Sequence, residues 1–205
     1  MEIKVLKGIM SANECIAAEN RIMFKKNNIT AVNIMASPGA GKTSLIVKMI
    51  EELINTVSIS VVEGDIASNI DAEKIDKLGI PVVQINTGGG CHLDASMIRS
   101  SVESLALKDN TLLLIENVGN LVCPSAFDLG ENIKLVIASV PEGDDKPYKY
   151  ISMFEAADVI ILNKIDLMPY MDFNRESFYK GITALNQKSP VFEVSLKTGE
   201  GIDKF

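Results

Sequence analysis

The sequence predicts an α/β fold: a doubly wound, mostly parallel sheet of about seven strands with helices on both faces. Two observations lead to this prediction. Short runs rich in Val, Ile and Leu recur along the chain, as is typical of strands buried on both faces of a parallel sheet. Segments of helical length separate these runs, and such alternation is the pattern of a doubly wound fold.

The apolar runs are the candidate strands, and each is bounded by polar or glycine-containing segments. They are residues 30–37, 58–63, 81–87, 111–117, 133–140, 159–163 and 190–195. We expect a single domain over residues 1–205, with residues 1–29 as an N-terminal helical extension. The chain ends where a further helix should begin, which suggests a truncated final helix.

Composition argues against several classes of protein. The formal net charge of −7 disfavours nucleic acid as the main partner, since phosphate backbones attract a surplus of Lys and Arg. No apolar run reaches the roughly 18 residues of a membrane span, and the N-terminus lacks the apolar core of a signal peptide. The three widely spaced cysteines do not form a disulfide framework, so we expect a reducing, cytoplasmic location. Cys15 is expected to pack as a small buried residue of the N-terminal helix.

The segment ASPGAGKTS (36–44) lies between the first expected strand and an apolar helical run, and it resembles a phosphate-binding loop. Gly41, Lys42 and Thr43 complete the pattern G-x-x-x-x-G-K-[ST], in which Ala36 replaces the first glycine. Small residues let backbone N–H groups turn toward phosphates, Lys42 reaches the β and γ oxygens, and Thr43 ligates Mg²⁺. The alternative is a glycine-rich turn without a ligand. The nucleotide-binding residues expected in this loop are Gly39, Ala40, Gly41, Lys42, Thr43 and Ser44.

A second motif, NKID, follows the sixth expected strand and predicts a guanine-specific base site. Asp166 can accept two hydrogen bonds from the N1 and N2 donors of guanine, which adenine lacks. Asn163 would tie this loop to the phosphate loop, and the stem of Lys164 would cover the base. After the last strand, SLKTGEG resembles the loop that closes over guanine in GTPases, which adds Ser195 and Lys197. The expected ligand is GTP or GDP, and the alternative reading of NKID is a turn capped by Asn and Asp.

Two acidic residues at strand ends extend this interpretation to a magnesium site. Asp65 follows the second strand, and Glu116 forms an E-x-x-G pattern with Gly119 that resembles the D-x-x-G of GTPases. Both carboxylates should face the carboxyl edge of the sheet, where doubly wound folds bind their ligands. We expect Asp65 to bind Mg²⁺ or to position water, and Glu116 to be an outer-shell ligand of the Mg²⁺ that Thr43 binds. The N–H of Gly119 should meet the γ-phosphate. The expected catalytic residues are Lys42, Asp65 and Glu116.

The predicted rate of hydrolysis is slow. Asn120 follows Gly119, where fast Ras-type GTPases present a water-orienting Gln. We therefore expect a second protomer to assist hydrolysis. The polar loop PEGDDKPYK carries Lys146 and Lys149, which could contact the nucleotide, also in trans. A solvated charged loop explains these lysines at least as well.

Two cysteines and the single histidine follow successive strands. Cys91 and His92 come after the third strand and Cys123 after the fourth; the separation, 123 − 91 = 32, is about one β-α-β crossover. Two thiolates and an imidazole suit Ni²⁺ or Zn²⁺ rather than Mg²⁺ or Ca²⁺. Three ligands leave a position for water or for a second chain, as in a two-fold dimer. The spacing is equally compatible with unrelated thiols and a histidine near a helix that Asp94 opens.

The ordered motifs SPGAGKTS, VVEGDIASNIDAEKI, NTGGGCHLDA, LLIENVGNLVCPS, PEGDDKPYKY, NKIDL and SLKTGEGID resemble those of the hydrogenase nickel-incorporation GTPases, HypB, of the SIMIBI class. The resemblance spans essentially the whole chain. It implies a GTPase that forms GTP-dependent homodimers and delivers nickel, with the metallochaperone HypA, to the precursor of the [NiFe]-hydrogenase large subunit. It also implies that Cys91, His92 and Cys123 bind Ni²⁺, with Zn²⁺ possible at the same site.

The chain departs from some members of this family, and other functions remain as alternatives. It has no N-terminal CxxCGC motif and no His-rich tract, so tight nickel storage is not expected. The related urease-type nickel GTPases typically carry a Cys-Pro-His motif, which CHLDA does not match. A small-molecule kinase is a second alternative, which NKID and S-x-K disfavour. A third is a metal-binding nucleotide switch with negligible turnover, which Asn120 keeps open.

Overall fold

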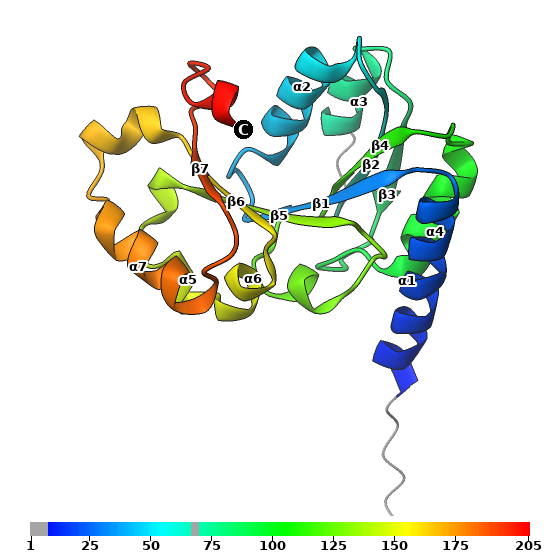
Figure 1. The fold of residues 1–205 in the computed structure, drawn as a ribbon, viewed down its shortest axis with the longest axis horizontal. Helices are drawn as coiled ribbons and strands as arrows, with labels where there is room; N and C mark the ends of the chain where they lie inside the picture. Colours follow the sequence, from blue (N-terminus) through cyan, green and yellow to red (C-terminus); the bar gives the residue numbers. More distant parts are fainter. Residues whose placement is uncertain (1–7, 67–69) are drawn as a thin grey trace, which may run out of the picture.

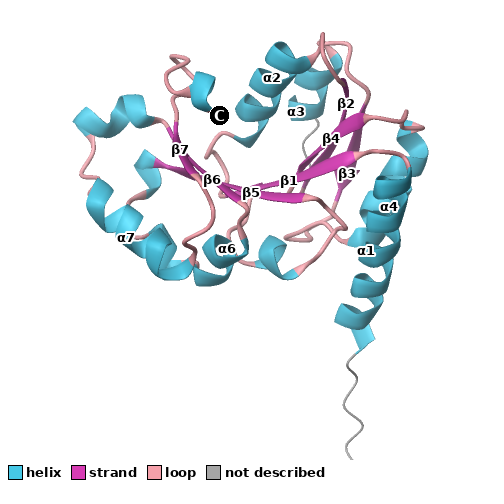
Figure 2. Cartoon of the chain, viewed as in Figure 1, coloured by secondary structure: helices cyan, strands magenta, loops and turns pink. Residues whose placement is uncertain are grey.

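The computed structural model describes residues 8–66 and 70–205, and its strands form one seven-stranded sheet (Figures 1 and 2). In chain order the strands are β1 (Thr30–Ala36), β2 (Ser58–Asp65), β3 (Val82–Asn86), β4 (Thr111–Glu116), β5 (Ile133–Ser139), β6 (Val159–Asn163) and β7 (Val191–Glu193). Their order in the sheet is β3-β2-β4-β1-β5-β6-β7, and every neighbouring pair is parallel. The predicted fold class is confirmed.

The helices alternate with the strands, as predicted. They are α1 (Gly8–Lys26), α2 (Lys42–Leu53), α3 (Ile70–Asp76), α4 (Ala95–Leu105), α5 (Lys146–Lys149), α6 (Ile151–Ala156) and α7 (Arg175–Leu185). Short 3₁₀ helices are η1 (Cys123–Ala126), η2 (Val140–Glu142), η3 (Ile165–Tyr170) and η4 (Ile202–Lys204). None of the helices within the described ranges is both long and apolar enough to cross a membrane.

Helices cover both faces of the sheet because side chains alternate along each strand. Val32 and Ile34 of β1 pack with Leu45 and Ile46 of α2 on one face. Met35 points to the opposite face, where α6 and α7 pack over β5 and β6. On that same opposite face, α1 and α4 cover β2 and β4. Figure 1 shows α2 and α3 above the sheet and the other labelled helices below it.

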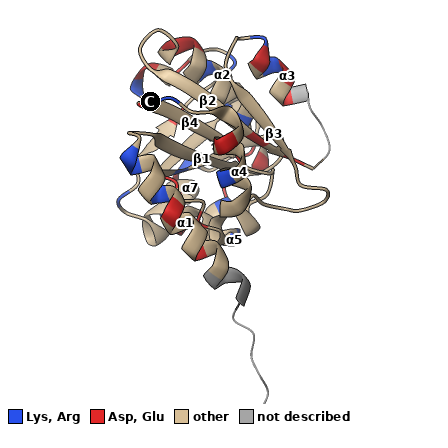
Figure 3. Ribbon diagram, turned by 90° about the vertical axis from the view of Figure 1, so that its right-hand side faces the viewer, with Lys and Arg blue, Asp and Glu red and all other residues tan. Residues whose placement is uncertain are grey.

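Helix α1 packs against α4 along one buried stripe (Figures 1 and 3). Asn13, Ala17, Asn20 and Phe24 are buried and recur at helical spacing. Cys15 lies off this stripe and is exposed, so the prediction of a buried thiol is wrong. In the predicted extension, residues 1–7 lie outside the described ranges.

The packing of α1 can be tested by truncating its buried aromatic side chain. Phe24 is fully buried whereas Ile22, on the same helix, is 69% exposed. Phe24→Ala should lower the free energy of unfolding by about 3–5 kcal/mol, because it leaves a cavity. Ile22→Ala should change it by less than about 0.5 kcal/mol. Urea unfolding measures both, and equal effects would contradict the packing of α1 against the sheet.

Candidate functional site

The phosphate-loop candidate connects β1 to α2, as the sequence predicted. Gly39 and Gly41 have φ angles of +76° and +115°, a region that glycine adopts without strain. A Cβ on Gly41 would also collide with the side-chain amide of Asn163. Glycine is therefore required at position 41 for two independent reasons. The loop leads into the N-terminus of α2, which begins at Lys42.

The NKID loop is hydrogen-bonded to the phosphate loop. Nδ2 of Asn163 donates to the carbonyl of Ala40 at 2.9 Å, and Nζ of Lys164 donates to the carbonyl of Gly39 at 2.6 Å. The Oδ1 of Asn163 also accepts from the backbone N–H of Leu196 at 3.2 Å. The amide of Asn163 therefore joins three loops, which fixes the base side of the site relative to the phosphate side.

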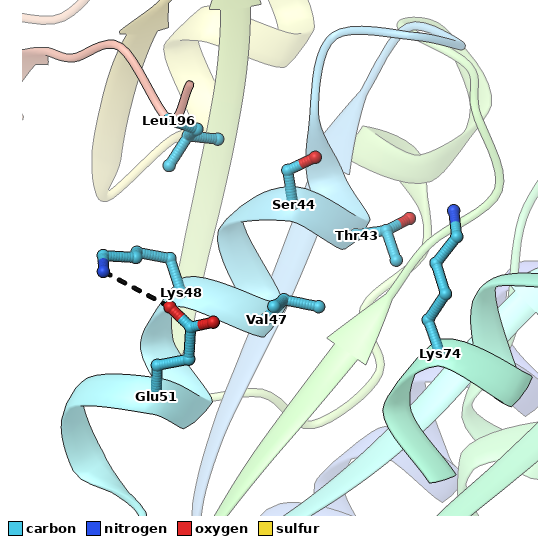
Figure 4. Close-up of a pocket in the computed structure, with 7 residues that line it drawn as sticks. All are labelled: Thr43, Ser44, Val47, Lys48, Glu51, Lys74 and Leu196. Carbon is cyan, nitrogen blue, oxygen red and sulfur yellow. Dashed lines mark hydrogen bonds and ion pairs between the residues drawn. The ribbon is translucent and has the colours of Figure 1, made fainter. Parts of the chain in front are cut away.

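A cavity of about 430 Å³ opens between these loops. Asp166 lines it, and Oγ of Ser195 donates to its Oδ1 at 2.7 Å, which orients the carboxylate. Exposed Lys197 lines the same cavity. Figure 4 shows an adjoining cavity at the start of α2, where Thr43 and Ser44 lie opposite Lys74. The predicted base-site and phosphate-site residues thus line adjacent cavities.

A buried cluster of charges lies at the start of α2. Oγ1 of Thr43 donates to Oε1 of Glu116 at 3.0 Å, and Nζ of Lys42 lies 3.9 Å from the same oxygen. Burial raises the pKa of Glu116 to about 7, although Lys42 and the Thr43 hydrogen bond oppose this shift. Glu116 is therefore where the E-x-x-G motif predicted it, beside the residues of the phosphate loop.

Glu63 belongs to the same cluster and was missed by the sequence analysis. It is the register partner of Glu116 on the neighbouring strand, and both residues are 3% exposed. Burial, with the adjacent Glu116 charge, raises the pKa of Glu63 to about 8. Among the described residues, the Oε2 atoms of Glu63 and Glu116 are buried without a hydrogen-bond partner. A carboxylate oxygen of each residue lies within 4.8 Å of one on the other, and buried carboxyl groups this close favour a bound cation or a retained proton. The sequence does offer one signal for Glu63, because it is an acidic residue at the end of an otherwise apolar strand segment.

Two further carboxylates flank this cluster. Asp65 is the last residue of β2, not a residue beyond it, and its Oδ1 accepts from the N–H of Ile66 at 2.7 Å. Asp71 of α3, which the sequence analysis did not single out, has a carboxylate oxygen within 4.8 Å of those of Glu63 and Glu116. Lys74 pairs with Asp71 at 2.7 Å.

The loop after β4 leads from this cluster to the cysteines. Gly119 lies against the phosphate loop, because a Cβ there would be 2.9 Å from Cγ of Pro38. The side chain of Asn117 is fully buried, and its Oδ1 accepts from the N–H of Leu93 at 3.1 Å. Nδ2 of Asn120 donates to the carbonyl of Cys91 at 3.3 Å. This loop is thus hydrogen-bonded to the Cys-His segment.

Cys91, His92 and Cys123 come together at the carboxyl edge of the sheet. The Sγ atoms of Cys91 and Cys123 are 2.9 Å apart, and Nδ1 of His92 lies 3.6 Å from Sγ of Cys91. The His92 ring stacks on Phe127, with centroids 3.7 Å apart and planes at 22°. Burial lowers the pKa of His92, which favours the neutral, metal-binding imidazole. The three side chains are therefore neighbours, as the metal-site interpretation requires, and Asp94 caps α4, as the alternative interpretation expected.

In the polar loop after β5, both lysines contact residues of the same loop. Lys149 forms an ion pair with Asp145, and Nζ of Lys146 lies 5.2 Å from the centroid of the Tyr150 ring. Glu142, which the sequence analysis did not single out, accepts hydrogen bonds from Ser37 of the phosphate loop and from Ser139. The loop therefore contacts the phosphate loop through an acidic residue.

Known proteins resemble the chain over most of its length. The family described as CobW/HypB/UreG, nucleotide-binding domain matches residues 30–193. A hydrogenase maturation factor HypB from Rhizobium leguminosarum bv. viciae is 51% identical over 203 residues, which cover 99% of this chain and 68% of that protein.

Solved structures agree with this comparison. The crystal structure of HypB from Archaeoglobus fulgidus has a TM-score of 0.88 at 41% identity and covers 95% of each chain. That of HypB from Helicobacter pylori in complex with nickel has a TM-score of 0.87 at 40% identity, covering 95% of this chain and 91% of that one. The chain therefore belongs to the CobW/HypB/UreG nucleotide-binding family and, within it, to the hydrogenase maturation factors HypB.

Proposed function

We propose that the chain is a GTP-hydrolysing accessory protein that delivers nickel during the maturation of [NiFe]-hydrogenase. One observation carries the proposal: the loop after β4, which leads to Cys123, contacts the phosphate loop at Gly119 and is hydrogen-bonded to Cys91 through Asn120. Membership of the HypB family supports it, and so does the nickel-bound structure of the Helicobacter pylori relative. The cargo metal and the nucleotide would thus be handled by adjoining parts of one sheet edge.

The cluster of Cys91, His92 and Cys123 has the donor chemistry for this cargo. Its sulfur and nitrogen atoms all lie within 4.8 Å of one another. Thiolates and imidazole suit Ni²⁺ and also Zn²⁺. Three ligands leave the metal accessible to water or to a second protomer, and an incompletely enclosed metal can be passed on. A homodimer that forms with GTP would bring two such clusters together.

Coupling between nucleotide and metal would pass through the loop after β4. This loop begins beside Glu116, contacts the phosphate loop at Gly119 and reaches Cys123 seven residues after Glu116 (123 − 116 = 7). Asn117 and Asn120 tie it to the segment that carries Cys91. A shift of the loop toward a γ-phosphate would therefore move one ligand-bearing segment relative to the other.

The nucleotide is GTP in this proposal. Asp166 would accept the N1 and N2 hydrogens of guanine, with Asn163, Lys164, Ser195 and Lys197 completing the base site. The backbone of Gly39–Gly41, together with Lys42, Thr43 and Ser44, would hold the phosphates. The Gly119 N–H would meet the γ-phosphate.

The acidic cluster fits Mg²⁺, because among the described residues the Oε2 atoms of Glu63 and Glu116 are buried without hydrogen-bond partners, while Oε1 of Glu116 accepts from Thr43. Thr43, Asp65 and Glu116 would hold the ion, with Glu63 next to them. When bound, Mg²⁺ neutralises charge on the β- and γ-phosphates. Lys42 would stabilise the developing phosphate charge, and Asp65 would position the attacking water.

Turnover by a single chain should be slow. Asn120 occupies the position of the water-orienting Gln of Ras-type GTPases, but its amide is committed to the Cys91 carbonyl. A second protomer would supply a group that assists hydrolysis. Lys146 could be that group only after leaving the Tyr150 ring, and Lys149 only after leaving Asp145. HypA and the hydrogenase large-subunit precursor are the proposed partners, in the cytoplasm.

Guanine specificity can be tested at Asp166. Asp166→Asn should weaken GDP binding by about a hundredfold or more, because two charge-assisted hydrogen bonds are lost, each worth about 1.5–3 kcal/mol. XDP has an oxygen in place of the N2 amine, and the Asp166→Asn variant should lose less affinity for XDP than for GDP, or bind XDP more tightly than the wild type does. Calorimetric titration with GDP, ADP and XDP measures this, with the exposed Asp172→Asn as control. Unchanged GDP binding in Asp166→Asn would refute the base site.

Metal–nucleotide coupling can be tested by titrating Ni²⁺ and Zn²⁺ into the protein with GDP or a non-hydrolysable GTP analogue. The metal affinity should differ between the two nucleotide states by about 5- to 150-fold, or 1–3 kcal/mol. Cys91→Ala should abolish binding, whereas the exposed Cys15→Ala should not affect it. Asn120→Ala should keep metal binding and reduce the difference between nucleotide states. Equal affinities in both states would rule out a nucleotide-controlled delivery site.

The buried carboxylate pair predicts the pH dependence of stability. The folded state keeps a proton on Glu63, whose pKa is about 8, at pH values where the unfolded chain, with a pKa near 4.5, has lost it. This contribution is complete below about pH 4.5 and is lost as the pH rises through 8. The unfolding free energy in EDTA should therefore fall between about pH 4.5 and 8, and less steeply in Glu63→Gln. Glu103→Gln, at an exposed site, is the control. Identical slopes in all three proteins would contradict the buried pair.

A further inference from the structure

The N-terminal helix contacts both segments that carry the Cys-His-Cys cluster. Asn13, on the buried stripe of α1, is 8% exposed and uses both atoms of its amide. Its Oδ1 accepts from the N–H of Ala95 at 2.9 Å, and its Nδ2 donates to the carbonyl of Asp128 at 2.8 Å. Ala95 begins α4 three residues after His92, and Asp128 follows Cys123 by five residues. One side chain therefore bridges the two ligand-bearing segments.

The bridge lies next to a second contact between the same segments. The His92 ring stacks on Phe127, the residue directly before Asp128. The position of the imidazole thus depends on how the backbone at Ala95 sits relative to the backbone at Asp128. Asn13 fixes that relation with two hydrogen bonds from one rigid amide plane.

Neighbouring residues of α1 reinforce the bridge. Nδ2 of Asn20, which is fully buried, donates to the carbonyls of Ala95 and Leu129 at 2.8 and 3.0 Å. Arg21 forms hydrogen bonds of 2.8 Å to both carboxylate oxygens of Asp128. The α1 helix is consequently attached to both segments, and Figure 3 shows it lying beside α4.

We propose that Asn13 is a positioning residue of the metal site, through which α1 sets the distance between the Cys91–His92 pair and Cys123. This inference rests on the proposed function, since it assumes that the cluster binds metal. Removing the bridge leaves a buried N–H and a buried carbonyl without partners, and only Asn20 of α1 then joins the two segments, so their spacing is less tightly held. Partners that orient metal ligands from outside the coordination shell typically change metal affinity by about 10- to 100-fold.

The nucleotide site provides an internal reference for this proposal. The nucleotide-site cavities are lined by residues of the phosphate loop, of α2 and α3, and of the segments after β6 and β7, and none of these lining residues belongs to α1. Loss of the bridge should therefore change metal binding without changing GDP binding. A general loss of structure would weaken both.

The test measures Ni²⁺ affinity by competition with a chromogenic chelator, together with the thiolate-to-nickel charge-transfer absorption. Asn13→Ala should weaken Ni²⁺ binding about tenfold or more and alter the absorption band, with GDP affinity unchanged. Asn13→Asp keeps an acceptor for the Ala95 N–H but loses the donor to the Asp128 carbonyl. It should therefore weaken Ni²⁺ binding too. This variant distinguishes the bridge between the two segments from a simple hydrogen bond to the first turn of α4, which Asp can still accept.

Glu14→Ala, an exposed change one residue away on α1, is the matched control and should bind Ni²⁺ like the wild type. Wild-type Ni²⁺ affinity and spectrum in Asn13→Ala would overturn the proposal, as would wild-type behaviour of Asn13→Asp. If the wild-type chain bound no Ni²⁺, or if Cys91→Ala bound it equally well, the proposed function itself would fall and this inference with it.

Discussion

The parallel pairing of β4 with β1 and β2 is the constraint on which both candidate sites depend. In a parallel sheet all strands end at one edge, so the loop after β1 and the loop after β4 emerge side by side. The β4 loop then serves two neighbours. It meets the phosphate loop at Gly119, and through Asn117 and Asn120 it meets the segment that carries Cys91.

Electrostatics distinguish the two halves of this edge. Beside α2, the carboxyl groups of Glu63 and Glu116 are buried with raised pKa values, an arrangement that a hard divalent cation relieves. On the cysteine side, the donors are soft, and burial lowers the pKa of His92. The ends of four adjacent strands, β3, β2, β4 and β1, thus carry two donor sets of different chemistry, oxygen ligands on one side and sulfur and nitrogen ligands on the other.

The strands and the nucleotide motifs were predictable because their signals are local. Apolar runs set the strands to within two residues, and NKID and GKT carry their chemistry in consecutive positions. Glu63 was missed because a single acidic residue in an apolar run does not reveal which strand will lie beside it. The bridge at Asn13 was invisible for the same reason, since its partner Ala95 is 82 residues away. Cys15 was misplaced because composition does not say which face of a helix is buried.

The strand order also bears on how the chain acquires its sites during synthesis. Thr30 of β1 pairs with Leu112 (112 − 30 = 82), and Val32 pairs with Ile133 (133 − 32 = 101), so β1 has no partner strand until much of the chain has been made. Such non-local pairing slows folding and leaves apolar strands exposed on nascent chains. The phosphate loop takes its shape only after β4 and β5 emerge, and its contact with Asn163 must wait for β6. The contacts around the nucleotide pocket that come from Glu116, Asn163 and Leu196 are therefore available only after these later segments have been made.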